Sequence, residues 1–498
     1  MLIKRILAAL LCTATVTAML VSCGGSDTPA AGNPDTTTAG GDAAETTVAE
    51  ETTTKELSAY DYLPEKNYDG KSFTVYTPDS GTRYLPGQII TTEETGDVIM
   101  DAAYVRNRNV EDKFNVEIKH ITGSGSAYYT GIRSAVQAGD TAYDLTAGFL
   151  SKMADLGVEP IFIDATNLPY VDVENPWYGK ANEALQINGK QSLFFSDYTC
   201  ITLSCTYGLF YNKDLGSEYD VPDLTQTVID GGWVIDDMLK YTQGVSKDLD
   251  GNGTFDLNDQ YGNLSFTTHM KTSDTAVTYQ YGMGNFTTVM GDDDLPVIAL
   301  NNEKQYSIVQ KLYTLFYEDN RTLQSTEAGS KVAPLFANGQ GLFFNAIIMH
   351  AANYMRDMED DYMVLPLPKY DEAQEQYYTM LSQTSSFLYG VPMSAADAEY
   401  SSIIFDALAY EGYKNVIPAF FEVSMKVKYS RDDLTSQVFD LLRDNTHVDF
   451  GLVYGGNGMS TLIGKVLAEK STDFASAYAS IEASAIDRYN KVIEQLTK

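Results

Sequence analysis

Cysteine is scarce in this chain of 498 residues, which contains only four. Cys12 and Cys23 lie at the N-terminus, so Cys200 and Cys205 are the two that remain for the body of the protein. In an extended run, residues five apart point to opposite faces and lie too far apart for a disulfide. We therefore predict two buried free thiols, with a disulfide as the alternative if the chain turns between them.

Histidine is equally scarce and forms no recognisable metal pair, because the four histidines are scattered and show no HExxH pattern. The sequence also lacks a GxSxG nucleophile elbow and a P-loop. The sequence therefore carries none of these signatures of zinc peptidases, α/β-hydrolases and P-loop NTPases. The paired carboxylates of a glycosidase remain possible on this basis, because their spacing is spatial rather than sequential. We predict that the protein is not an enzyme.

Basic residues are few. Lys and Arg number 34 against 68 Asp and Glu, which gives a formal net charge of −34. Such a balance argues against nucleic acid and anionic lipid as partners. Tyrosine, in contrast, is abundant at 35 residues. A tyrosine ring offers a flat apolar face with a hydroxyl, which suits sugars, although ordinary packing and surface roles account for most tyrosines.

The N-terminus has the pattern of a secretory signal. Lys4 and Arg5 precede an almost wholly apolar stretch over residues 6–21, which closes on Leu20-Val21-Ser22-Cys23. The stretch is short for a membrane-spanning helix, which needs about 20 residues. Its end resembles the lipobox of bacterial lipoproteins, which implies cleavage before Cys23 and diacylglycerol on the Cys23 sulfur. The alternative is an ordinary signal with an incidental cysteine.

These features predict a signal peptide over residues 1–22 and a location on the extracellular face of the cell membrane, held by the lipid. Residues 23–58 are rich in Thr, Ala, Gly, Glu and Asp and nearly free of aliphatic side chains. Such a segment buries too little apolar surface to fold, so we predict a disordered spacer. At ~5–6 Å × √n it would reach about 30–35 Å.

The remaining residues are enough for two lobes rather than one small core. Hydrophobic periodicity predicts strands at 71–76, 116–121, 143–147, 192–195 and 208–211. It predicts helices at 97–114, 128–138, 305–317, 401–413 and from 473 to the end. Strands that alternate with helices indicate an α/β fold with largely parallel sheets.

Six short motifs in order resemble the extracellular solute-binding proteins of ABC importers, in particular the maltose-binding group. They are AGD with YD at 138–144, INGK at 187–190, YGLFYNKDL at 207–215, GGWVIDDMLKY at 231–241, LFANGQGLFFN at 335–345 and VLPLP at 364–368. The likeness spans residues 71–498. Each motif alone is weak evidence, and their order behind a lipobox is much stronger evidence.

The resemblance implies a two-lobed α/β fold of the periplasmic-binding-protein type, with hinge strands and an interlobe ligand cleft. It implies a first lobe built from 59–200 and 331–383. The second lobe would be built from 206–330 and 384–498. In open α/β sheets and between lobes, ligands bind at the carboxyl ends of strands.

The ligand-binding residues that the resemblance implies lie in loops at strand ends or in the crossings between lobes. They are Asp79, Phe149, Trp177, Asp197, Tyr198, Phe266, Thr267, His269, Asn345 and Ser385. A carboxylate such as that of Asp79 can accept two hydroxyl protons, although Asp79 could instead belong to a turn. The Trp177 ring could stack on a sugar or serve as a rigid packing residue near the hinge. The stacking tryptophan of maltose binders is absent after residue 148, which puts maltodextrin itself in doubt.

A separate motif predicts a structural calcium site over residues 248–259. Oxygen-bearing residues occupy positions 1, 3, 5, 9 and 12 of a calcium loop, glycine occupies position 6, and a backbone carbonyl is available at position 7. The predicted ligands are Asp248, Asp250, Asn252, Thr254, Asp256 and Asp259. Position 12 is Asp rather than Glu, which resembles dockerin-type loops more than sensor EF-hands. The alternative is a solvated acidic turn.

The sequence therefore predicts a monomeric, lipid-anchored protein that delivers a small ligand to ABC permease subunits by hinge closure. The expected ligand is a mono- or oligosaccharide. The alternative function is a surface-anchored glycoside hydrolase or glycan-binding adhesin.

Overall fold

The structure is a computed structural model that describes residues 58–79, 88–89, 91–266, 274–324, 329–425, 433–455 and 458–498. Leu57–Lys498 form one compact unit. The predicted signal peptide, nearly all of the predicted spacer and Cys23 lie outside the described residues, as do Thr267 and His269.

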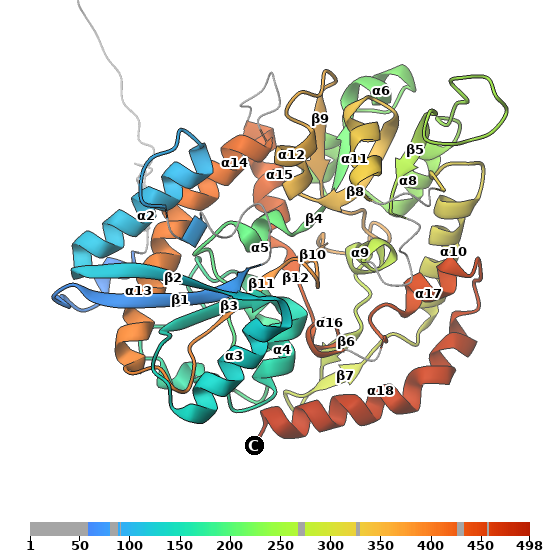
Figure 1. The fold of residues 1–498 in the computed structure, drawn as a ribbon. Coiled ribbons are helices and arrows are strands. Elements are labelled where there is room, and N and C mark those ends of the chain that lie inside the picture. The colour runs from blue at the N-terminus through green and yellow to red at the C-terminus, as the bar shows by residue number, and fades with distance from the viewer. Residues whose placement is uncertain are drawn as a thin grey trace, which may run out of the picture. The chain divides into compact units, whose positions relative to one another are not determined.

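The first lobe is built on a four-stranded sheet in the order β11-β3-β1-β2 (Figure 1). The strands are β1 (Lys71–Asp79), β2 (Val116–Ser124), β3 (Leu145–Phe149) and β11 (Phe387–Gly390). β1 runs parallel to both β2 and β3, whereas β11 runs antiparallel to β3. The sheet therefore takes three strands from the first part of the chain and one from a much later part.

Helices cover both faces of this first sheet. They are α2 (Val98–Phe114), α3 (Gly125–Ala138), α4 (Leu150–Gly157) and α13 (Ala398–Glu411). On one face, Phe73 and Val75 of β1 share a core with α2 and α13. On the other face, Tyr76 of β1 packs with residues of α3 and α4. The strand period of two thus divides the side chains of β1 between two buried layers.

The second lobe contains a sheet in the order β5-β8-β4-β9. Its strands are β4 (Tyr207–Asn212), β5 (Tyr261–Leu264), β8 (Gly341–Ile347) and β9 (Tyr362–Leu365). Only β5 and β8 are parallel, because β4 runs antiparallel to both of its neighbours. All four strands are buried except for the first residue of β4 and the last of β8, which explains their nearly continuous apolar sequences.

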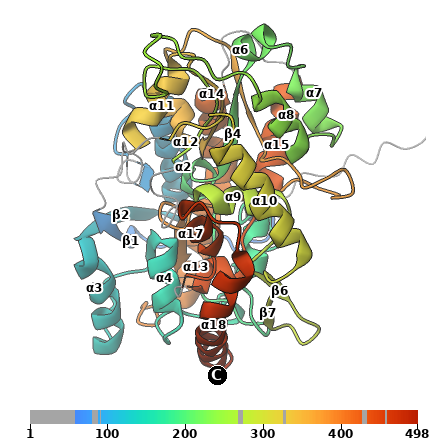
Figure 2. The same ribbon diagram turned by 90° about the vertical axis from the view of Figure 1, so that its right-hand side faces the viewer.

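The remaining helices and short strands include α17 and α18, which pack together with α10 below the second sheet as it is drawn in Figures 1 and 2. The helices are α5 (Ile201–Ser204), α6 (Lys213–Glu218), α7 (Leu224–Ile229), α8 (Ile235–Thr242), α9 (Thr275–Gly282), α10 (Glu303–Tyr317), α11 (Gly329–Ala337), α12 (Met349–Tyr354), α14 (Ile417–Met425), α15 (Asp433–Asp444), α16 (Phe450–Tyr454), α17 (Leu462–Ala468) and α18 (Phe474–Leu496). The short strands are β6 (Thr288–Met290), β7 (Pro296–Ile298), β10 (Thr379–Met380) and β12 (Thr446–His447).

The chain crosses between the two sheets more than once, and the first two crossings lie side by side. The first leads through α5 into β4, and the second leads from β10 into β11. The amide of Ser382 in the second crossing donates to the carbonyl of Cys205 in the first, at 3.0 Å. A bridge between Thr206 and Leu381 joins the same two segments. Paired crossings of this kind can act as a hinge.

The strand pairing corrects the predicted grouping of the later segments. Residues 331–383 were assigned to the first lobe, but β8 and β9 pair within the second sheet. Residues 384–498 were assigned to the second lobe, but β11 pairs with β3 in the first sheet. The predicted strand at 192–195 is also wrong, because only an isolated bridge from Phe194 to Tyr389 forms there. The sheets are mixed rather than largely parallel.

Candidate functional site

The carboxyl end of β3 meets the second crossing. The rings of Phe149 and Phe387 lie 4.8 Å apart in an edge-on arrangement, and the amide of Leu150 donates to the carbonyl of Ser386 at 2.8 Å. The amide of Phe149 donates to the Tyr129 hydroxyl at 3.2 Å. Two predicted residues, Phe149 and Ser385, are therefore brought into one region, and both are partly exposed.

A buried carboxylate lies where the second crossing meets the second lobe. Asp274, which precedes α9, accepts from the amide of Gln383 at 3.2 Å and from the Tyr207 hydroxyl at 3.4 Å. Burial raises the pKa of Asp274 to about 6. Hydrogen bonds from Ser382, Gln383 and Tyr207 oppose this rise in the pKa. Sequence reasoning missed Asp274, because an aspartate before a helix is an ordinary N-cap signal.

Several polar atoms near this junction are buried without a hydrogen-bond partner among the described residues. They are Gln383 Nε2, Ser386 Oγ, Thr202 Oγ1 and Asn345 Oδ1. Buried polar groups in proteins nearly always have a hydrogen-bond partner. Several unpartnered polar atoms in one region therefore mark a place where a bound molecule could supply the missing hydrogen bonds. The region formed by Tyr129, Phe149, Asp274, Gln383, Ser385 and Ser386 is named the crossing site below.

Phe266 and Asn345 lie on the second-lobe side of the crossing site. Phe266 packs against Phe344 at 5.7 Å and against the His350 ring at 6.2 Å. Asn345 is buried and donates through Nδ2 to the Thr278 hydroxyl at 2.7 Å, which holds α9 against β8. The Asn345 side chain therefore positions the helix that follows Asp274.

Asp79 is exposed at the end of β1, next to the undescribed residues 80–87, so its role in ligand binding stays a prediction.

Trp177 corrects the prediction of a stacking platform. Its side chain is fully buried, its ring packs edge-on against Tyr410 at 5.2 Å, and its Nε1–H donates to Asp406 Oδ1 at 2.9 Å. Burial raises the pKa of Asp406 to about 6, against the opposing effect of hydrogen bonds from Tyr62, Trp177 and Tyr178. The alternative interpretation of Trp177, a rigid packing residue, is the one that the structure supports.

Asp197 and Tyr198 lie in the first crossing, but each side chain is in contact with an arginine side chain of the protein itself. Asp197 is buried and forms an ion pair with Arg443 at 2.8 Å. Tyr198 is fully buried, and the Arg106 guanidinium lies 4.4 Å from the centre of its ring. The prediction that these two side chains face the ligand is therefore wrong.

The two cysteines of the body are buried free thiols, as predicted. The reason differs from the predicted one, because Ile201–Ser204 form the short helix α5 rather than an extended run. Burial raises the pKa of both thiols to about 12, so neither is a reactive thiolate at neutral pH.

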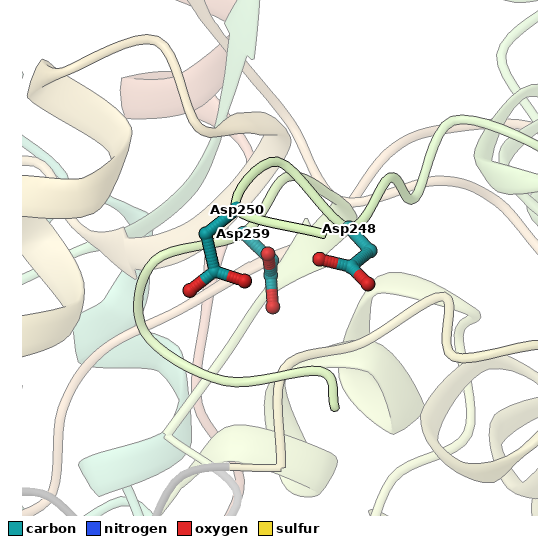
Figure 3. A group of neighbouring side chains, drawn as sticks. All are labelled: Asp248, Asp250 and Asp259. Carbon is teal, nitrogen blue, oxygen red and sulfur yellow. The ribbon is translucent and has the colours of Figure 1, made fainter. Parts of the chain in front are cut away.

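Three of the predicted calcium ligands converge (Figure 3). Asp248, Asp250 and Asp259 each offer one carboxylate oxygen, and these oxygens all lie within 4.8 Å of one another. Hydrogen bonds hold the loop, including those from the amides of Gly251 and Gly253 to Asp248 at 2.7 and 2.8 Å. The pKa of Asp248 is lowered, and the hydrogen bond from the Gly253 amide is the main cause. Gly253 has φ +79°, as the predicted sharp turn at position 6 requires.

The other three predicted ligands are outside this carboxylate group. Asn252 Oδ1 accepts from the amide of Thr254 at 2.7 Å, and Asp256 Oδ1 accepts from the amide of Asn258 at 2.8 Å. Calcium takes six to eight oxygens at about 2.3–2.6 Å. The carboxylate donor set is of the right chemical kind, and Asn252, the Thr254 carbonyl and Asp256 would have to supply the remaining oxygens. The loop joins α8 to β5, so the two helices of an EF-hand are absent from this described segment.

Within the described residues, no helix is both long enough and apolar enough to cross a membrane.

Similar solved structures share the fold along most of the chain. UgpB from Mycobacterium tuberculosis in complex with glycerophosphocholine has a TM-score of 0.57 at 13% identity and covers 85% of this chain and 99% of its own. The cyclic α-maltosyl-1,6-maltose binding protein from Arthrobacter globiformis has a TM-score of 0.55 at 15% identity, with 86% and 99% covered.

A third similar structure is the ABC substrate-binding protein Lmo0181 from Listeria monocytogenes in complex with cycloalternan. Its TM-score is 0.53 at 16% identity, and the likeness covers 86% of this chain and 100% of that chain. No protein-family model and no curated protein sequence matches this chain. The fold is therefore that of the two-lobed substrate-binding proteins of ABC transporters, as predicted.

Proposed function

We propose that this protein is the substrate-binding component of an ABC importer and that it binds a carbohydrate at the crossing site. The observation that carries the proposal is the shared two-lobed fold, in which one similar structure holds cycloalternan and another is a binding protein for cyclic α-maltosyl-1,6-maltose. The crossing site adds aromatic faces from Phe149 and Tyr129, together with unpartnered polar atoms from Gln383 and Ser386. Aromatic faces beside hydrogen-bonding groups are what a sugar needs.

Ligand binding would work by hinge closure rather than by chemistry. A ligand that contacts both lobes binds the closed form better than the open form, so it shifts the population toward closure. The paired crossings at Cys205 and Ser382 are suited to this motion. The closed form would then dock on the permease subunits. The glycoside hydrolase and adhesin alternatives gain no support from the similar structures, among which are binding proteins of ABC transporters.

The test is a thermal-shift panel of mono- and oligosaccharides, with glycerophosphocholine as the non-sugar comparison. A cognate sugar at a hundredfold excess over its Kd should stabilise the folded state by about 2.7 kcal/mol. Gln383→Ala should weaken that shift while leaving the ligand-free melting temperature nearly unchanged, because Gln383 Nε2 has no hydrogen-bond partner to lose among the described residues. Gln137→Ala, at an exposed position of α3, is the matched control. If glycerophosphocholine raised the melting temperature and no sugar of the panel did, the proposal of a carbohydrate ligand would be wrong.

We further propose that Cys23 carries a lipid that holds the protein on the extracellular face of the cell membrane. The support is the charged start, the apolar stretch and the lipobox-like Leu20 to Cys23. The spacer over residues 23–58 would let the protein reach the permease.

We also propose that residues 248–259 bind calcium as a structural ion. Asp248, Asp250 and Asp259 would supply the first oxygens, and the ion would relieve the repulsion among their carboxylates. With the weak affinity of extracellular modules, at roughly 10⁻⁴–10⁻³ M, calcium at ten times Kd should stabilise the folded state by about 1.4 kcal/mol. Magnesium should do less, because it demands near-ideal octahedral geometry.

The calcium proposal is checked by melting temperatures with chelator and with millimolar calcium. Asp248→Asn with Asp250→Asn should erase the calcium response. Asp292→Asn with Asp294→Asn, which removes two exposed charges from the β6–β7 turn, should retain it. Equal melting temperatures with chelator and calcium would reduce the loop to an acidic turn.

A further inference from the structure

A side chain of the second lobe is bound by groups of the first lobe. Arg443 lies near the end of α15, and α15 packs against α7 and β9 of the second lobe (Figure 2). Arg443 Nη2 donates to Asp197 Oδ2 at 2.8 Å and to the carbonyl of Pro176 at 3.2 Å. Its guanidinium also lies 4.7 Å from the centre of the Tyr413 ring. Arg443 and these three partners are named the Arg443 clamp here.

The three partners of Arg443 belong to the first lobe. The amide of Asp197 donates to the carbonyl of Trp177 at 2.8 Å, and the Trp177 side chain lies in the core that also contains side chains of β1. Pro176 directly precedes Trp177, and the Tyr413 ring packs on the same core. A side chain on Gly412 would collide with the Asp197 carbonyl, so the chain after α13 fits closely against Asp197. Three groups fixed to one lobe therefore bind a cation carried by the other lobe.

Partial burial makes this contact stronger than a surface ion pair. The Arg443 side chain is 23% exposed and that of Asp197 is 12% exposed. Water and salt screen such a pair less than they screen two exposed charges. A guanidinium presents a rigid fork of donors and a flat face for an aromatic ring, and the clamp uses both. Moving α15 away from the first lobe would leave the Asp197 carboxylate buried without its cation, which is unfavourable.

Beside the clamp, a cavity of about 540 Å³ separates the two lobes. Residues 173–191 form one wall, and Asp440, Arg443 and Asp444 of α15 line the other. Protein interiors are close-packed, so two walls in full contact cannot shift without breaking that packing. The cavity leaves α15 room to move relative to residues 173–191 once the contacts of Arg443 are released. The clamp therefore restrains a motion that the packing around it permits.

A rotation about the paired crossings moves α15 together with the second sheet, so it changes the distances from Arg443 to Trp177, Asp197 and Tyr413. We infer that the Arg443 clamp holds the hinge in the described position and that its release frees the two lobes to move. The inference rests on the proposed function for the purpose of this motion, since a binding protein uses it to enclose a ligand. The clamp itself is defined without any ligand.

The experiment measures the distance between the lobes by pulsed electron paramagnetic resonance in the absence of ligand. Spin labels on Ser134→Cys in α3 and Ser217→Cys in α6 report on the two lobes, because both positions are exposed. The mature chain, residues 23–498, carries Cys23→Ala. The two native cysteines of the body are buried free thiols and escape labelling. We expect one main distance for this labelled parent protein.

Arg443→Gln should add a second population at a different distance. Arg443→Lys keeps the charge beside Asp197 and should restore most of the parent distribution. Arg321→Gln is the matched control, because Arg321 is also buried, pairs with Asp319 at 2.8 Å and donates to the Leu239 carbonyl at 2.6 Å. These partners of Arg321 lie in the second lobe, so the control should leave the distance between the lobes unchanged.

A double variant guards against a misfolded single variant. Asp197→Asn with Arg443→Gln leaves no buried charge, so it should unfold cooperatively and show the same second population. Unchanged distances in both clamp variants would overturn the inference, and so would the same new population in Arg321→Gln. A distribution of Arg443→Lys equal to that of Arg443→Gln would also contradict it, because the ion pair is the proposed restraint. No sugar is present, so this inference and the proposed transport function can fail separately.

Discussion

Trp177→Ala should lower the free energy of unfolding by about 3–5 kcal/mol, the range for removing a large buried aromatic side chain. The ring is fully buried against Tyr410, so its loss leaves a cavity. The change also removes the Nε1–H bond to Asp406, whose carboxyl is itself buried. Denaturant unfolding of the ligand-free protein measures the effect.

Two further variants separate the causes of this loss. Trp177→Phe keeps most of the ring but loses the bond to Asp406, so its cost should be intermediate. Ile486→Ala truncates an exposed apolar side chain on α18 and should change stability by less than about 0.5 kcal/mol. If Trp177→Ala instead left unfolding unchanged and removed sugar binding, the ring would face the ligand and the described packing would be wrong.

Cys23→Ala should abolish acyl labelling of the protein completely, because the thioether to the lipid has no other sulfur in the lipobox-like sequence. Labelling with a radioactive fatty acid in the bacterial host, followed by mass measurement of the mature protein, checks this. Cys12→Ala is the matched control, since Cys12 lies inside the predicted signal and should leave labelling intact. Persistent labelling of the Cys23 variant would contradict the proposed anchor.

The sequence predicted the first strand and the first long helix of the first lobe well, because each is encoded locally. The alternating pattern at 71–76 and the amphipathic stretch at 97–114 became β1 and α2, with Asp97 accepting from the amides of Ile99 and Met100 as the N-cap. The assignment of later strands to sheets failed. The strands at 341–347 and 362–365 are buried apolar runs that fit either sheet, and only long-range pairing decides between them.

In the candidate sites too, features encoded locally were predicted, and features that depend on long-range contacts were not. The calcium-type loop is local in sequence, and three of its six predicted ligands do converge. The sequence around Trp177 does not indicate whether its side chain is buried or exposed, because an aromatic ring in a segment that contains Pro and Gly can face either solvent or the core. Its burial follows from Asp406, which is 229 residues away. Asp274 and Gln383 were missed because their significance appears only where the second crossing meets α9.

The most direct test of the central claim is a calorimetric titration of the mature protein with the best saccharide from the thermal-shift panel. A binding protein should give saturable heat that returns to the baseline after each injection, with one site per chain and weaker binding by the Gln383→Ala variant. Steady heat that continues while sugar remains would show turnover and favour the glycoside hydrolase. Titrations without saturable heat for every sugar of the panel would contradict the carbohydrate-binding account.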